Sequence, residues 1–252
     1  MQLEKILKND RLIIIAGIAA VSLISWTYMA KMSVTTGSLA SVHAAHAWAM
    51  NDLVSHFMMW LVMMVAMMLP TAGPMILTFS FISRDRKQKE QPYVKTAIFV
   101  MGYLIVSVGY SLLVTVLQWW LHHSVLLTSI GASNSNVLSG VLLVAAGIFQ
   151  WSKIKQACLR FCRNPFNFVM TNWKEGVPGA LHMGIKHGLL CAGCCWALML
   201  LMFVGGVMNL IWMILITSII LIEKVAPRGD IFAKVAGVAM AVIGIYFILS
   251  HF

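Results

Sequence analysis

Charged residues are scarce in this sequence. Asp, Glu, Lys and Arg make up 10% of its 252 residues, whereas soluble globular domains carry about 25%. With 60% hydrophobic residues, the chain has too few charges to coat a surface that faces water. This composition excludes a soluble globular fold. Lipid can cover such a chain instead, and apolar helices of about 20 residues are the units that cross a bilayer.

Acidic residues are the rarest charged class, with eight Asp and Glu against 18 Lys and Arg and a net charge of +10. A basic excess can indicate a nucleic-acid binder, but such a protein presents a basic face interleaved with aromatic residues. Here the basic residues form short clusters between apolar runs, which is typical of membrane-protein loops. We therefore expect the lipid bilayer, and no nucleic acid, as a partner. No catalytic motif is visible, which favours a protein without enzymatic activity.

Seven apolar runs predict an all-α polytopic membrane bundle that forms one domain, residues 1–252. The first run follows a basic start like a signal peptide, but it is long enough to remain as a signal anchor. Pro70 and Pro74 interrupt the second run, which membrane helices tolerate where neighbours compensate. Gly205, Gly206 and Asn209 divide a long apolar stretch into two helices joined by a turn. The expected spans are 12–30, 53–81, 94–121, 137–151, 186–204, 207–223 and 231–249.

The basic residues predict the orientation of these spans, because Lys and Arg concentrate in cytoplasmic loops. With seven spans, seventeen of the 18 basic residues fall on the side of the N-terminus, and only Lys31 falls on the other. We expect the N-terminus inside and the C-terminus outside, in a bacterial inner membrane. The basic residues on the inner side are Lys5, Lys8, Arg11, Arg84, Arg86, Lys87, Lys89, Lys95, Lys153, Lys155, Arg160, Arg163, Lys174, Lys186, Lys224, Arg228 and Lys234.

Three of the five cysteines lie within five residues at the inner end of the fifth span. At 100° per residue, His187, Cys191, Cys194 and Cys195 share one helical stripe. Thiolates with imidazole suit Cu(I), and they also suit Zn(II). The alternative is packing, because cysteine is a small apolar residue and small residues line helix interfaces in membranes.

A second cysteine pair, Cys158 and Cys162, follows the fourth span with the spacing of one helical turn. Both cysteine groups fall on the cytoplasmic side, where thiols stay reduced. They are therefore expected to be free thiols that close into one site, rather than disulfides.

Further soft or ionisable residues are candidate auxiliary ligands. The chain has 19 methionines, whose thioethers either bind Cu(I) or fill the core. Glu223 near membrane depth requires a partner, for which Lys224, Lys186 and His187 are candidates; otherwise it serves as a proton or metal group. The full auxiliary set is Met63, Met64, Met67, Met68, Met75, Met199, Glu223 and, on the outer side, His43 and His46.

Three segments together resemble a bacterial family described as predicted metal-binding integral membrane proteins. They read WxxMxxAMMxPTxxPM over residues 60–75, KxxCxxxCRxP over 155–165 and HGxxCxGCCW over 187–196, followed by GxVMN at 205–209 and the Glu223–Lys224 pair. The resemblance covers about residues 60–224. It implies a multi-pass membrane protein that binds metal.

We therefore predict an integral membrane protein that binds a soft transition metal, copper first as Cu(I) and Zn(II) second. Its expected role is metal transport or delivery to a membrane or metalloprotein partner. Two alternatives stay open. One is a membrane thiol-disulfide oxidoreductase that uses the two cysteine groups. The other is a non-catalytic subunit of a membrane complex.

Overall fold

The computed structural model describes residues 2–39, 50–85, 92–124, 127, 132–133 and 135–250. Apart from one isolated bridge between Leu127 and Ser133, all regular structure in these ranges is helical. The expected all-α bundle is confirmed. The helices are α1 (Gln2–Leu39), α2 (Met50–Asp85), α3 (Pro92–His123), α4 (Asn136–Gln150), α5 (Lys153–Arg163), α6 (Pro165–Thr171), α7 (Gly176–Leu200), α8 (Met202–Gly205), α9 (Leu210–Val225) and α10 (Gly229–Leu249).

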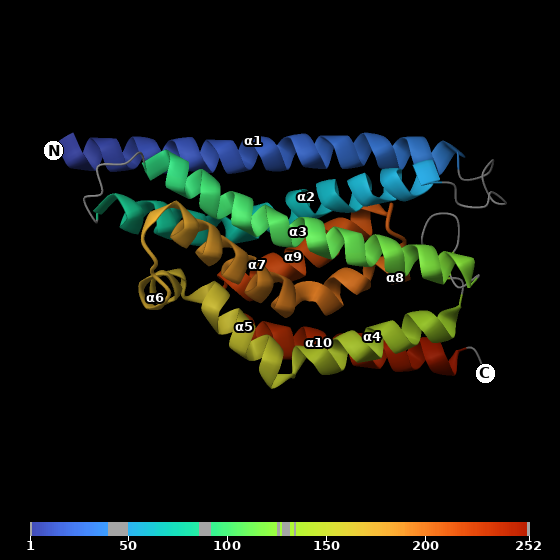
Figure 1. Cartoon of the computed structure of the whole chain (residues 1–252). Helices are drawn as coiled ribbons and strands as arrows, with labels where there is room; N and C mark the ends of the chain where they lie inside the picture. Colours follow the sequence, from blue (N-terminus) through green and yellow to red (C-terminus); the bar gives the residue numbers. More distant parts are fainter. Residues whose placement is uncertain are drawn as a thin grey trace.

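Each of the seven expected runs is largely helical, the fifth being divided between α7 and α8, and the helices alternate in direction along the bundle (Figure 1). The start of α1 and the end of α10 therefore lie at opposite ends. Among the described residues, α1, α2, α3, α7 with α8, and α10 are each long and apolar enough to cross a membrane.

The helices of the remaining two runs, α4 and α9, are too short to be counted as crossings by themselves, so the expected seven crossings are not all supported. Helix α4 has 15 residues and meets α5 at a bend of 63°. Helix α9 has 16 residues, a length of about 24 Å at 1.5 Å per residue, against a hydrocarbon core of about 30 Å. Length and composition in the described part of the chain thus support five crossings, or six with α4 and α5 as one broken span.

Close backbone contacts hold two helix pairs together. Helix α4 packs on α10, where a Cβ atom at Gly147 would lie 2.6 Å from the carbonyl oxygen of Gly237. Helix α3 packs on α7, where a Cβ atom at Gly184 would overlap the carbonyl group of Phe99. Only glycine permits these approaches, which are the usual way in which membrane helices gain packing contacts.

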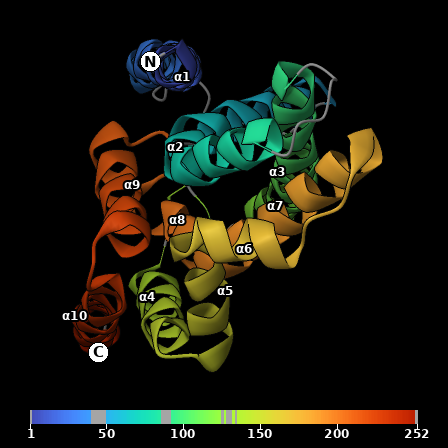
Figure 2. The ribbon, with the colours of Figure 1, turned by 90° about the vertical axis from the view of Figure 1, so that its left-hand side faces the viewer.

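The expected turn after the fifth span is confirmed. Helix α7 ends at Leu200, the short α8 follows, and Gly206 adopts a left-handed φ of 91°. The Asn209 side chain then caps α9 by accepting a hydrogen bond of 3.2 Å from the Trp212 backbone N–H. Helix α7 begins at Gly176, ten residues before the expected span, and α5 and α6 lie across this end of the bundle (Figure 2).

A single side chain compensates for a proline inside α2. Pro70 has no N–H, so the carbonyl of Ala66, four residues earlier, loses its helical partner. The indole Nε1 of Trp26 in α1 donates a hydrogen bond of 3.0 Å to this carbonyl oxygen. The helix continues through Pro70, and α1 is fixed to α2 at the point where the backbone bond is missing.

Replacing Trp26 is therefore expected to loosen α1. Trp26→Phe leaves the Ala66 carbonyl without a donor and should lower the free energy of unfolding by about 1 kcal/mol. Pro70→Ala restores a backbone N–H, so the Trp26→Phe change should cost much less in the Pro70→Ala background. Thermal unfolding of the four proteins in detergent measures this coupling, with the exposed Trp120→Phe as control. Additive effects of the two changes would contradict the assignment.

Candidate metal centre

The helical stripe predicted from the sequence is buried. His187, Cys191, Cys194 and Cys195 of α7 each have a relative exposure of 3% or less. Leu189 and other residues of the opposite face are exposed. The four residues that the helical period places on one stripe therefore share the buried face of α7.

The second cysteine pair comes from α5, which packs directly across α7. A Cβ atom at Gly193 would lie 3.3 Å from the Cys158 sulfur, so the absence of a side chain there admits this thiol. The Cys162 thiol lies next to the Cys194 thiol. All five cysteines are free, and Cys158 and Cys162 are half-buried. The structure thus brings the two cysteine groups together, as expected from the sequence.

The thiols of α7 are held by local hydrogen bonds. Cys194 and Cys195 both donate to the backbone carbonyl of Cys191, at 3.1 and 3.0 Å. The Cys195 sulfur also lies 3.6 Å from the Met68 sulfur of α2. Within the described ranges, no three side chains from His, Cys, Asp and Glu are arranged to hold a metal ion as they stand. A metal site at this position requires the thiols to rotate away from the helix carbonyl.

A small cavity adjoins these sulfurs. It has a volume of about 10 Å³ and lies between α2, α3 and α7, where Met64, Met68 and Cys191 are among the residues that line it. Tyr103 and Ser107 of α3 line its other side. The space is about that of one water molecule.

His187 is buried without a hydrogen-bond partner. Neither Nδ1 nor Nε2 finds a donor or acceptor among the described residues. The imidazole ring lies 5.7 to 6.0 Å from the rings of Phe99, Tyr103 and Phe168. Buried polar atoms are usually paired, and leaving one unpaired costs free energy. His187 lies one helical turn before Cys191, on the same buried face of α7.

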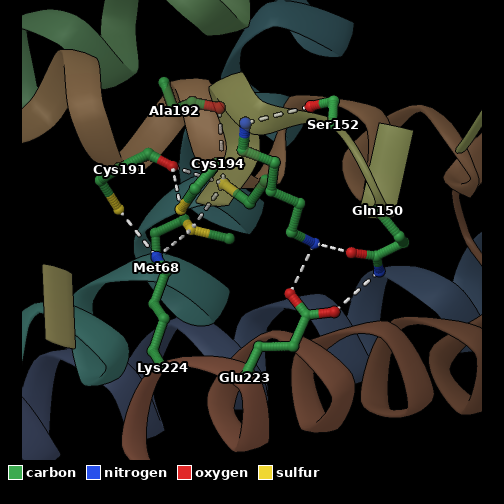
Figure 3. Close-up of polar contacts among 10 residues, drawn as sticks. Met68, Gln150, Ser152, Cys191, Ala192, Cys194, Glu223 and Lys224 are labelled. Carbon is green, nitrogen blue, oxygen red and sulfur yellow. Dashed lines mark hydrogen bonds and ion pairs between the residues drawn. The ribbon is translucent and has the colours of Figure 1, made fainter. Parts of the chain in front are cut away.

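Lys224 also belongs to this cluster, although its sequence position indicated only an inner-side charge or a partner for Glu223. Its side chain is buried, and its Nζ donates to the Cys191 sulfur at 2.9 Å. Nζ also lies 3.2 Å from the Thr71 hydroxyl and 3.9 Å from the Met68 sulfur. Figure 3 shows Lys224 reaching from α9 to Cys191 and Met68. The sequence feature that could have indicated this role is the position of Lys224 at the end of an apolar run, where a buried lysine requires a partner.

The expected partners of Glu223 were wrong. Lys224 turns to the thiols, and Lys186 binds the Asn172 side chain instead. Glu223 forms a buried ion pair of 2.7 Å with Lys155 at the start of α5, and both side chains are at most 3% exposed. Gln150, the last residue of α4, donates to the same carboxylate at 2.7 Å and accepts from Lys155. The ends of α4 and α9 and the start of α5 therefore meet beside the sulfur cluster.

The auxiliary methionines are buried, each with a relative exposure of 4% or less. Met64 and Met68 line the cavity beside Cys191. Met63, Met67, Met75 and Met199 belong to the same hydrophobic core as the cysteines, which leaves their packing interpretation open. His43 and His46 lie outside the described residues.

The fold and this cluster define an all-helical protein with thiol and thioether side chains gathered in its core. A family model described as "PpoB2: Copper chaperone" matches residues 57–247, about three quarters of the chain. The chain therefore belongs to this copper chaperone family, and handling of copper is the function that the family indicates. No curated protein and no solved structure gives a significant match.

The buried ion pair makes a prediction about stability. Lys155→Met leaves the Glu223 carboxylate buried with only Gln150 as donor, which should cost about 3–5 kcal/mol of unfolding free energy. Lys155→Met combined with Glu223→Leu removes both charges and should cost much less. Denaturation of the purified variants in detergent measures the difference. The Asp230→Asn change in the exposed Arg163–Asp230 pair is the control, with a small effect expected. A double variant no more stable than Lys155→Met would contradict the pairing.

Proposed function

We propose that this copper chaperone is an integral protein of the bacterial inner membrane that binds Cu(I) at the sulfur cluster of α7 and delivers it to a partner metalloprotein. Cu(I) is the first candidate and Zn(II) the second. The observation that carries the proposal is the convergence of three buried and two half-buried free thiols beside the Met68 thioether. Thiolate and thioether ligands select Cu(I) among the common biological metals.

The ligand set follows from these contacts. Cys191 and Cys195 lie beside Met68, and Cys194 faces Cys162 of α5. Rotation of the Cys194 and Cys195 side chains releases their thiols from the Cys191 carbonyl and turns them toward an ion. His187, whose ring nitrogens have no partner among the described residues, supplies an imidazole one turn away. Zn(II) prefers four tetrahedral ligands, whereas a site of few sulfur atoms is sufficient for Cu(I).

Cys158 and Cys162 provide the route into the cluster. Both are half-buried on α5, which crosses one end of the bundle, and Cys162 contacts the fully buried Cys194. Copper arriving at α5 passes from thiol to thiol without leaving sulfur coordination. The basic residues gathered near this end support a cytoplasmic location for α5. Thiols there stay reduced, as metal exchange requires.

Copper binding by purified protein tests the proposal. The wild-type protein, in detergent and under anaerobic reducing conditions, should bind Cu(I) in competition with a chromophoric Cu(I) chelator. Cys191→Ser combined with Cys194→Ser should remove most of the bound copper in elemental analysis. Equal metal content in this variant and the wild type would overturn the proposal. Zinc as the retained metal would favour the second candidate.

A methionine pair gives the matched control for the thioether. Met68→Leu removes the sulfur beside Cys195 and should weaken Cu(I) binding by about 10-fold, the effect typical of a supporting ligand. Met58 lies on the same helix with a relative exposure of 48%, so Met58→Leu should leave the affinity unchanged. The same chelator competition reads both variants. A weaker affinity in both, or in neither, would exclude a role for Met68.

A further inference from the structure

We infer that Lys224 is the residue that makes the sulfur cluster select monovalent over divalent soft ions. The inference rests on the proposed Cu(I) site and adds a determinant of specificity to it. Lys224 places a positive charge 2.9 Å from the Cys191 sulfur, in contact with the atoms that would hold the metal. Any ion bound there shares the thiolates with this charge.

The contacts of Lys224 identify it as an ammonium group. Its three N–H donors have three acceptors: the Cys191 sulfur, the Thr71 hydroxyl oxygen and the Met68 sulfur. The Thr71 hydroxyl donates its own proton to the Met68 carbonyl at 2.9 Å, so its oxygen lone pairs face Lys224. The α2 and α7 helices thus both provide acceptors that fix the amine in the cluster.

The positive charge of Lys224 is directed at the thiols because no carboxylate neutralises it. Within the described part of the chain, Lys224 forms no ion pair with Asp or Glu. Glu223 is the neighbouring residue, but its carboxylate is already bound by Lys155 and Gln150. Figure 3 shows Glu223 and Lys224 leaving α9 toward these separate partners. The sulfur atoms are therefore the groups that balance the lysine.

Charge balance then decides which ion the site accepts. A monovalent ion held by two thiolates carries a net charge of −1, which Lys224 cancels. A divalent ion held by the same thiolates is neutral, so the lysine charge is left uncompensated in a buried site. Uncompensated charge is costly where water is excluded. Repulsion between Lys224 and the ion also grows with ionic charge, since the Coulomb energy is proportional to it.

Silver(I) and cadmium(II) separate charge from chemical softness, because both favour sulfur ligands while differing in charge. Dissociation constants for Ag(I) and for Cd(II) are measured by chelator competition on the full-length protein in detergent. Lys224→Leu and Lys224→Gln remove the charge without adding a sulfur atom, and Lys224→Gln keeps an N–H donor in place. Lys234→Leu, at an exposed lysine on α10, is the control. Each protein is first checked for a monodisperse profile and a thermal transition like that of the wild type.

Removing the charge should shift the ratio of the Ag(I) and Cd(II) affinities toward Cd(II) by on the order of 100-fold, the scale expected for a unit charge about 4 Å from a partly screened ion. Lys234→Leu should leave the ratio unchanged. A ratio within threefold of the wild type in the folded Lys224 variants would overturn the inference. Wild-type protein that binds neither Ag(I) nor Cu(I) through its cysteines would overturn the proposed function itself. The two failures are therefore distinguishable.

Discussion

The hydrogen bond between the Lys224 ammonium and the Cys191 sulfur defines the chemistry of the bundle interior. The interior of this bundle is apolar and offers few polar groups to a charged side chain. Each buried charge therefore requires a partner at short range. Lys224 finds acceptors on α2 and α7. It thereby brings the end of α9 against the middle of two long helices and fixes the level at which the cysteines lie.

The neighbouring ion pair between Glu223 and Lys155 likewise joins helices, in this case α9 and α5. Glu223 and Lys224 are adjacent in α9, about 100° apart around its axis, so their side chains leave in different directions. Glu223 joins the end of α4 through Gln150 and the start of α5 through Lys155. Because α5 is held there, Cys162 reaches Cys194. The bent connection between α4 and α5 is thus part of the site: it carries two thiols from the bundle end to the core.

Local periodicity predicted what lies within one helix, and it failed where partners come from different helices. The buried stripe of α7, the helical spacing of Cys158 and Cys162 and the turn at Gly206 all follow from short-range rules. The pairing of Glu223 with Lys155 does not, because 68 residues separate them and the adjacent Lys224 looked equally suitable. Counting basic residues assigned Lys155 and Lys224 to inner loops, although both are buried. The rule describes loop charges and cannot recognise a lysine with a buried partner.

The Trp26 contact is a second case in which the sequence does not indicate the partner, here the donor to a backbone carbonyl. Proline in a membrane helix leaves a carbonyl to be satisfied, and the sequence indicates where, at Ala66, but not by which donor. The donor comes from α1, which the sequence predicts only as a signal anchor. Since α2 also carries Met64, Met68 and Thr71, the docking of α1 at Ala66 supports the helix face on which the cavity and Lys224 depend. Pro70, two residues after Met68, therefore links the packing of the N-terminal helix to the geometry of the sulfur cluster. The polar contacts of Trp26, Glu223 and Lys224 each join separate helices, which is the arrangement expected where water cannot compensate.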